Sequence, residues 1–235
     1  MNTKENILVV IPARGGSKGI PMKNIKSLNG KPLIEYSIEF ALRNFKKEQV
    51  FVSTDHKDIQ RAAQSCGILT PMLRPKHLAQ DYTSTYDVLL DIIKQKHAEG
   101  FSYKRILLLQ PTSPFRKIKH LSDILELDRP GVDMIVSVKE SKANPYFNLF
   151  EEDELGYLKQ SKQFNSSGRQ YAPKVFEYNG SMYLMKISSL QKNKINELKN
   201  VKKYIMSSLY SLDLDTHLDW DFAEYILKEN KIELH

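Results

Sequence analysis

Cations and glycines crowd into one short stretch near the start of the chain. An apolar run from Ile7 is followed by a basic, glycine-rich segment made of Arg14, Gly15, Gly16, Ser17, Lys18 and Gly19, with Lys23 and Asn24 close behind. Glycine permits close approach of the backbone to a ligand, and the cations supply positive charge. We interpret the segment as an anion-binding loop able to hold a triphosphate; the competing interpretation is a tight turn with exposed charges.

This loop matches neither of two common phosphate-binding motifs. GxxxxGK[ST] requires Ser or Thr after the lysine, whereas the order here is Ser17-Lys18-Gly19. GxGxxG requires a single-residue gap, which the adjacent pair Gly15-Gly16 lacks. The loop therefore disfavours an ATPase or a dinucleotide-dependent enzyme.

Paired carboxylates stand near the other end of the chain, in the segment "DLDT". Asp213 and Asp215 are two residues apart, so an extended backbone places both side chains on one face. A cation relieves the repulsion between two close carboxylates, and Mg²⁺ typically takes one or two carboxylates together with substrate phosphates. An alternative makes Asp213 part of a helix-start pattern in which Thr216 and Asp219 cap the last helix, and both interpretations can hold together.

Other chemistries lack their parts. The six histidines show no metal-ligand spacing, GxSxG is absent, and the single cysteine, Cys66, excludes a disulfide framework or a cysteine metal cluster. The net charge of +7 is spread over helix ends without a long basic run or an aromatic RNA-binding pattern, so nucleic acid stays a minor alternative. The N-terminus lacks the clean apolar region of a signal peptide, and no apolar stretch reaches about 20 residues. We expect a cytoplasmic protein that does not bind membranes.

Strand-length apolar runs alternate with segments of helical period. Strands are expected at 7–12, 50–54, 105–110, 133–138, 181–185 and 207–214, and helices at 31–45, 56–67, 84–100, 119–128 and 217–230. This alternation predicts an α/β three-layer sandwich around a mostly parallel sheet. Ligands bind beyond the carboxyl ends of such strands, where the basic loop, Asp55, "QPTSPFR" and "DLDT" follow their strands.

One region interrupts the alternation. Residues 141–175 are polar, rich in aromatic residues and without period, and they lie between two expected strands. A connection of this length in a compact domain is usually functional or a small subdomain. We therefore expect one domain over residues 1–235, with an inserted arm at about 141–180 that covers the site or a neighbouring subunit.

Several motifs together resemble one enzyme family. The segments "IPARGGSKGIPMKNI", "QPTSPFR" and "SLDLDTHLDWDFAEYIL" are similar to those of the acylneuraminate cytidylyltransferases, or CMP-sialic acid synthetases, and the likeness runs essentially end to end. The family includes enzymes for the related sugars legionaminate and pseudaminate, and the ketodeoxyoctonate cytidylyltransferases are more distant. The resemblance implies a Rossmann-like sheet of the nucleotide-diphosphosugar transferase type.

The resemblance also implies a reaction and roles for residues. CTP and a nine-carbon 2-keto sugar acid would give a CMP-sugar and pyrophosphate, a step in nucleotide-sugar biosynthesis for lipopolysaccharide or capsule. By this likeness Mg²⁺, with Mn²⁺ as a substitute, would be bound by Asp213 and Asp215, one of which would help to deprotonate the attacking hydroxyl. The implied catalytic residues are Arg14, Lys18, Lys23, Asp213 and Asp215. The implied nucleotide-binding residues are Arg14, Gly15, Gly16, Ser17, Lys18, Lys23, Asn24, Arg74, Ser84 and Thr85.

For the sugar acid, the resemblance implies Gln110, Arg169, Tyr183 and Lys142, with the arm forming a homodimer whose active sites are shared. Three alternatives stay open. In the first, the chain is a nucleotidyltransferase for another sugar acid, such as pseudaminate or ketodeoxyoctonate. In the second, it is a nucleotidyltransferase that uses another nucleotide base. In the third, it is a non-catalytic protein that binds anions or nucleic acid. The last predicts that Asp213 and Asp215 are dispensable and that affinity falls steeply with salt.

Overall fold

A six-stranded sheet forms the centre of the computed structural model, which describes residues 3–68, 72–80, 82–164 and 168–234. Its strands are β1 (Ile7–Pro12), β4 (Val50–Ser53), β5 (Arg105–Leu109), β6 (Met134–Glu140), β9 (Phe176–Lys186) and β10 (Val201–Ile205), in the order β10-β6-β9-β5-β1-β4. β9 runs antiparallel to β5 and β6, while β1 is parallel to β4 and β5, and β10 to β6. The predicted mostly parallel α/β sheet is thus confirmed.

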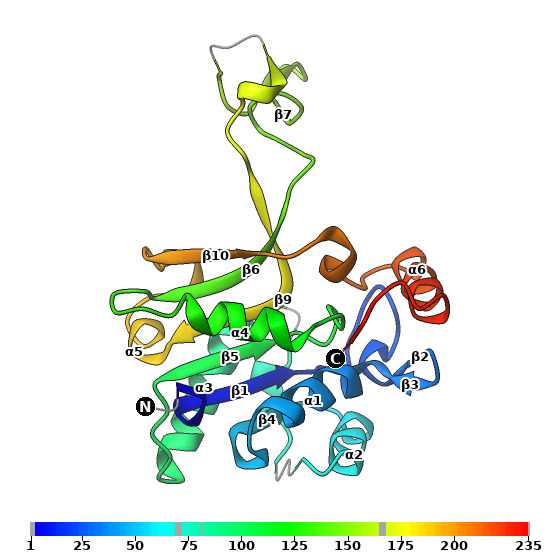
Figure 1. The fold of residues 1–235 in the computed structure, drawn as a ribbon, viewed down its shortest axis with the longest axis vertical. Helices are drawn as coiled ribbons and strands as arrows, with labels where there is room; N and C mark the ends of the chain where they lie inside the picture. Colours follow the sequence, from blue (N-terminus) through cyan, green and yellow to red (C-terminus); the bar gives the residue numbers. More distant parts are fainter. Residues whose placement is uncertain (1–2, 69–71, 81, 165–167, 235) are drawn as a thin grey trace.

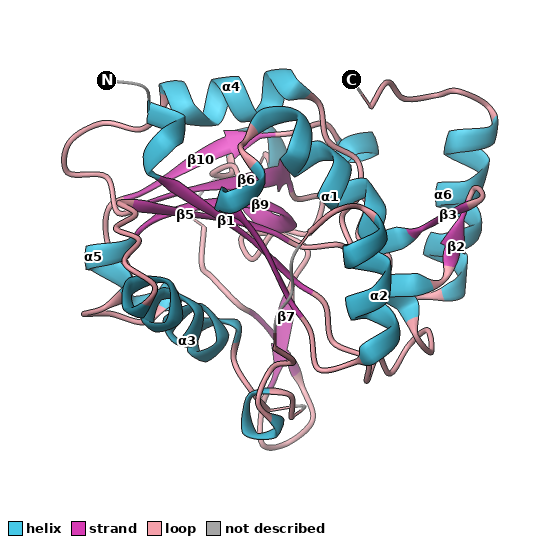
Figure 2. Ribbon diagram, turned by 90° about the horizontal axis from the view of Figure 1, so that it is seen from below, coloured by secondary structure: helices cyan, strands magenta, loops and turns pink. Residues whose placement is uncertain are grey.

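Helices cover both faces of this sheet because its central strands are apolar on both sides. In β1, Ile7, Val9 and Ile11 pack with α1 (Leu33–Asn44), α2 (Lys57–Ser65) and α4 (Ile118–Glu126). The alternate residues Leu8 and Val10 pack with α3 (Thr85–Ala98) and α5 (Ile187–Leu190). Figure 2 shows the resulting three layers, with the sheet between the two sets of helices.

A third apolar cluster ties the beginning of the chain to its last helix. The short strands β2 (Ser27–Leu28) and β3 (Lys31–Pro32) pair with each other, and Leu28 packs with Trp220 of α6 (His217–Lys228). The predicted cap of α6 is confirmed, because the Thr216 hydroxyl accepts from the Asp219 N–H and the Asp219 carboxylate accepts from the Thr216 N–H. This cluster brings the basic loop beside the "DLDT" segment.

The arm leaves the sheet after β6 and returns at β9 (Figure 1). Its base is closed by a 2.9 Å hydrogen bond from the Ser141 N–H to the Val175 carbonyl. Farther out lies a small hairpin of β7 (Phe150–Glu152) and β8 (Leu158–Gln160), whose turn exposes Leu155 almost completely. Phe150, Tyr157 and Leu158 of the same hairpin are exposed as well.

One predicted strand is wrong. Residues 207–214 do not join the sheet: Ser208–Ser211 form a 3-10 helix, and Leu209 and Leu212 pack against the third apolar cluster. The sheet's last strand is instead β10, with the sequence "VKKYI", where the apolar pattern predicted no strand. β10 is an edge strand with exposed lysines, so it lacks the apolar run used to predict strands.

Short 3-10 helices connect the main elements, at Thr3–Asn6, Lys23–Ile25, Lys47–Gln49, Lys76–Leu78, Arg169–Tyr171 and Ile195–Glu197 as well as Ser208–Ser211. In the described part of the chain, no helix combines the length and apolar character that crossing a bilayer requires.

Candidate active site

A cleft of about 500 Å³ opens at the carboxyl ends of β1 and β5. Ten residues predicted from the sequence line it together: Arg14, Ser17, Lys18, Lys23, Asn24, Arg74, Thr85, Gln110, Asp213 and Asp215. They come from segments as far apart as the basic loop and the approach to α6. The fold therefore assembles cations, amides and two carboxylates around one space.

Lys23 is a buried cation of this cleft that is fixed by two contacts. It is only 6% exposed, and its ammonium donates to the Leu214 carbonyl and, at 2.9 Å, to the Asp215 carboxylate. The Lys23–Ile25 turn begins after Met22, which has a left-handed backbone with φ of 51°. The Asp215 side chain is 71% exposed, so this carboxylate faces the cleft while Lys23 fixes it from behind.

Two of the loop glycines are required by close contacts. A Cβ on Gly19 would collide with the Asp215 carbonyl, and a Cβ on Gly15 would lie 2.9 Å from the His56 ring. Gly16 has open space around its Cβ position. The Gly15 N–H donates at 2.9 Å to the carboxylate of Asp55, which follows β4, so in this structure it is engaged within the protein. The glycines thus let the loop pack tightly against both sides of the cleft.

Asn24 and Arg74 present polar groups from two further elements. The Asn24 amide donates at 2.9 Å to the Arg14 carbonyl, and its side-chain oxygen is buried with no hydrogen-bond partner among the described residues. The Arg74 guanidinium donates to the Ser53 hydroxyl at 3.0 Å and to the Ser53 carbonyl at 2.6 Å. Burial lowers the pKa of Arg74, and the nearby Asp55 carboxylate opposes that shift.

The "QPTSPFR" segment contacts Asp213 through Ser113. The buried Ser113 hydroxyl lies 3.3 Å from the Asp213 carboxylate and 3.0 Å from the Asn179 carbonyl. Gly180 has a φ of 72°, and a Cβ there would lie 2.6 Å from the Ser113 hydroxyl and 2.8 Å from the Gln110 side-chain oxygen. A glycine at this position lets Gln110 and Ser113 approach β9.

Arg116, the last residue of "QPTSPFR", is not among the residues predicted from the sequence. Its guanidinium is fully buried and donates to the Ser181 and Gln110 carbonyls and to the Ser37 hydroxyl. Burial lowers the pKa of Arg116 to about 9, and Asp213 is the charge that opposes the shift. An arginine directly after Pro114 and Phe115 was the available signal. Arg116 positions the segment by tying α1, the loop after β5 and β9 together.

Several predicted residues are not brought into this cleft. The Ser84 hydroxyl caps α3, accepting from the Asp87 N–H at 3.2 Å and donating to its carboxylate at 2.6 Å. Lys142 is exposed at the base of the arm, and the Arg169 side chain lies outside the described part of the structure. Of the four residues predicted for the sugar acid, Gln110 alone is among those that line the cleft in the described residues.

Tyr183 lies on β9, close to this site. Its ring stands edge-on to Tyr178, with centroids 5.8 Å apart. Burial raises the pKa of Tyr183 to about 12, with smaller contributions from Tyr178 and Asp213. The Asp213 charge therefore acts on Tyr183, although this tyrosine is outside the set of cleft-lining residues.

Asp213 and Asp215 are the candidate metal ligands in the cleft. Their carboxylates are hard oxygen donors, which suit a divalent ion that completes its shell with water and substrate phosphates. Within the described ranges, no group of three or more His, Cys, Asp or Glu residues could hold an ion by itself. The donor set fits a metal that arrives with the nucleotide.

Comparison with known proteins identifies the family. The model of the family described as Cytidylyltransferase matches residues 8–211. This chain belongs to the cytidylyltransferase family. Over 96% of its length and 97% of the relative, it is 33% identical to the CMP-N,N'-diacetyllegionaminic acid synthase of Legionella pneumophila.

Two further cytidylyltransferases and one solved structure agree with this assignment. The chain is 31% identical to the CMP-N,N'-diacetyllegionaminic acid synthase of Campylobacter jejuni, covering 94% of both proteins. It is 30% identical to the N-acylneuraminate cytidylyltransferase of Streptococcus agalactiae, covering 96% of this chain and 56% of that longer protein. The structure of CMP:2-keto-3-deoxy-manno-octonic acid synthetase complexed with CTP has the same fold, with a TM-score of 0.71, 18% identity and coverage of 95% and 99%. The predicted family and enzyme class are confirmed.

Proposed function

We propose that this cytidylyltransferase transfers CMP from CTP to the anomeric hydroxyl of a nine-carbon 2-keto sugar acid of the legionaminate or N-acylneuraminate type. The observation that carries the proposal is the single cleft in which Arg14, Lys18 and Lys23 meet Asp213 and Asp215. Full-length similarity to two legionaminate enzymes favours legionaminate as the acceptor.

In this proposal the basic loop binds the triphosphate. Arg14, Ser17 and Lys18 contact the phosphates, and Lys23 reaches them from behind the Asp215 carboxylate. The buried, unpartnered side-chain oxygen of Asn24 supports a place for the nucleoside, because it gains a partner by accepting an N–H or O–H from a ligand. Arg74 and Thr85 complete that side of the cleft, whereas Ser84 contributes through the start of α3.

Asp213 and Asp215 would hold Mg²⁺, or Mn²⁺ in its place. The ion, when bound, would neutralise charge on the nucleotide phosphates. The Ser113 hydroxyl keeps Asp213 in position, and Lys23 does the same for Asp215.

The protein's own contribution to the step is orientation and charge. The anomeric oxygen forms a bond to the α-phosphorus while the bond to the bridging oxygen of pyrophosphate breaks. The hydroxyl proton passes to one carboxylate of the Asp213 and Asp215 pair. Arg14, Lys18 and Lys23 stabilise the negative charge that develops on the leaving pyrophosphate.

The sugar acid pocket is proposed to form between two chains. Gln110 lines the cleft from one chain, and the arm of a second chain would bring Arg169 and Lys142 toward it, near Tyr183. The planar fork of an arginine matches the carboxylate of the sugar acid. Two observations support this homodimer. Apolar side chains are exposed at the tip of the arm. Of the residues predicted to bind the sugar acid, Gln110 alone lines the cleft within the described residues.

The test is pyrophosphate release from the purified protein with Mg²⁺, each of the four nucleoside triphosphates in turn, and four acceptors. The acceptors are N-acetylneuraminate, legionaminate, pseudaminate and ketodeoxyoctonate. We expect release with CTP and one nonulosonate only, and we expect that nonulosonate to be legionaminate. Release with another nucleotide, or silence with all acceptors, contradicts the proposal.

A further inference from the structure

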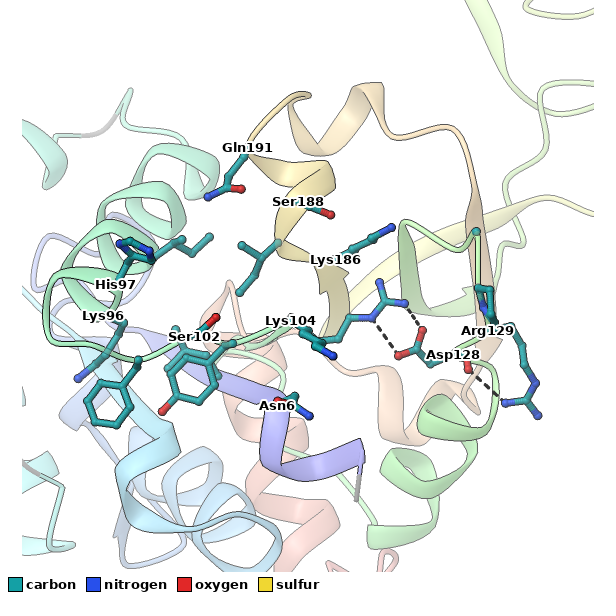
Figure 3. Close-up of a pocket in the computed structure, with 18 residues that line it drawn as sticks. Asn6, Lys96, His97, Ser102, Lys104, Asp128, Arg129, Lys186, Ser188 and Gln191 are labelled. Atoms are coloured by element: carbon teal, nitrogen blue, oxygen red, sulfur yellow. Dashed lines mark hydrogen bonds and ion pairs between the residues drawn. The ribbon is translucent and has the colours of Figure 1, made fainter. Parts of the chain in front are cut away.

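A second cavity, of about 730 Å³, is shown in Figure 3. It lies at the opposite end of the strands from the cleft. Leu8 near the start of β1, Arg105 at the start of β5 and Lys186 at the end of β9 all line it. The cleft proposed to bind CTP lies at the carboxyl ends of β1 and β5. This cavity at the amino ends of β1 and β5 is therefore separate from the proposed CTP site.

Positive charge dominates the lining. Five cationic residues, Lys96, Lys104, Arg105, Arg129 and Lys186, line the cavity together with one acidic residue, Asp128. The Arg105 guanidinium grips the Asp128 carboxylate with two of its nitrogens and donates to the Val132 carbonyl at 3.1 Å. Asp128, the one acidic residue of the lining, is therefore already paired with Arg105.

Two lysines of the lining lie outside the ion pairs of the described residues, although the Lys186 charge also acts on the nearby Asp133 carboxylate. Lys96 pairs with Glu99 at 2.7 Å, but within the described residues neither Lys104 nor Lys186 lies in an ion pair. Figure 3 shows Lys186 between Ser188 and Asp128 on one side of the cavity, with Lys96 and His97 on the other. Three cationic residues of the lining, Lys104, Arg105 and Lys186, thus lie where β5 and β9 meet.

The register of β5 and β9 places two of these cationic residues next to each other. Arg105 and Lys186 are directly opposite each other on the antiparallel strands β5 and β9, and Lys104 is the next residue along. Like charges in that relationship destabilise a sheet, and the Asp128 carboxylate offsets only the Arg105 part of this repulsion. An anion bound in the cavity would offset the repulsion, so the arrangement fits a ligand with negative charge.

The remaining wall is aromatic and polar. The rings of Phe101 and Tyr103 are stacked, with centroids 5.8 Å apart and planes 10° apart, and Phe101 stays substantially exposed. Ser102, Ser188 and Gln191 add hydrogen-bonding groups. A ligand that joins a phosphate to a planar ring can pair its phosphate with the cationic residues and stack its ring on the aromatic side chains.

We propose that this cavity is a second ligand site, which binds a nucleoside monophosphate with its phosphate toward Lys104 and Lys186 and its base toward Phe101. The volume lies within the range of small-molecule sites, about 300–1,000 Å³. The site shares no lining residue with the cleft, so it does not depend on the proposed reaction.

Calorimetric titration of AMP, GMP, CMP and UMP tests the proposal. The protein carries Arg14→Ala and Lys18→Ala, which disable the cleft and leave the second cavity intact. We expect at least one of the four to bind at one site per chain. Adding Lys104→Ala and Lys186→Ala should weaken that binding at least 10-fold, whereas adding Lys199→Ala and Lys202→Ala, which remove the same charge from exposed positions outside the cavity, should not.

Further measurements separate a specific site from general charge attraction. Phe101→Ala should weaken the nucleoside monophosphate by several-fold and leave the weak binding of inorganic phosphate unchanged. Absence of binding by all four nucleotides at millimolar concentration, or equal losses in the two lysine pairs, overturns the proposal. Pyrophosphate release by the Lys104→Ala/Lys186→Ala protein is measured in parallel, so that failure of the proposed function is read independently.

Discussion

Lys23 and Asp215 are separated by 192 positions in the sequence, and their side chains meet at 2.9 Å in the cleft. The lysine is buried and the carboxylate exposed, so the pair joins the basic loop to the acidic segment and presents the carboxylate to a ligand. This contact defines the spacing between the two halves of the proposed catalytic site.

Lys23→Met should slow pyrophosphate release by about 100-fold or more, because it removes a preorganised cation from the charge that develops on the leaving group. Lys26→Met is the matched control: it removes an equal charge from a lysine that lies over the Trp220 ring, 4.5 Å from its centroid. Steady-state kinetics and circular dichroism on both variants check the prediction. Equal activity in the two variants would contradict the role assigned to Lys23.

Asp213→Asn and Asp215→Asn should each abolish measurable turnover, because each removes a hard anionic oxygen at nearly constant shape. Asp221→Asn, at an exposed position of α6, should retain turnover. Titration of activity with Mg²⁺ checks the assignment. Normal Mg²⁺ dependence in either cleft variant would show that the ion is held elsewhere.

Gly180→Ala should lower the free energy of unfolding by more than Gly30→Ala. Both glycines have a left-handed backbone, with φ of 72° and 82°, which costs an alanine about 1–2 kcal/mol. At Gly30 the Cβ meets open space, but at Gly180 it overlaps the Ser113 and Gln110 side chains, adding about 1–3 kcal/mol. Urea unfolding of both variants isolates the overlap. Equal losses would mean that Ser113 and Gln110 move aside freely.

Stability should fall as the pH drops from about 6.5 to about 4, in part because of His120. Burial, followed by the nearby Lys117 charge, lowers the pKa of His120 from an ordinary value near 6.5 to about 4. The unfolded chain takes up the proton first, so this contribution is complete above pH 6.5 and is lost on acidification. His120→Gln should flatten the pH dependence of urea unfolding, and exposed His77→Gln should leave it as in the wild type.

Leu155→Glu combined with Leu158→Glu should shift the proposed dimer toward monomer, because both leucines are largely exposed on the arm hairpin. Light scattering after size exclusion measures the change, and the sugar acid KM should rise with it. Leu218→Glu, a substitution of an exposed leucine on α6, serves as control. A monomeric wild-type protein with full activity would remove the basis for a shared site.

Much of the fold followed from local pattern. The apolar runs of β1, β4, β5, β6 and the inner part of β9, and the helical periods of α1 to α4 and α6, predicted their elements because burial on a sheet demands those periods. β10 was missed because an edge strand with solvated lysines carries no such signal. The strand predicted at 207–214 was wrong because the serines and leucines of this segment fit a 3-10 turn packed on α6 as well as they fit a strand.

The sequence by itself determined the chemistry: a basic glycine loop, a pair of aspartates and motifs that match one family, since residue types and short spacings are local properties. The tertiary structure decided which of these groups meet. It placed Asp215 against Lys23 and Gly19, turned the Gly15 N–H to Asp55, and recruited Arg116 to hold Gln110 and β9. Such contacts join residues far apart in the chain, so packing of the whole sheet and its helices was needed to select them.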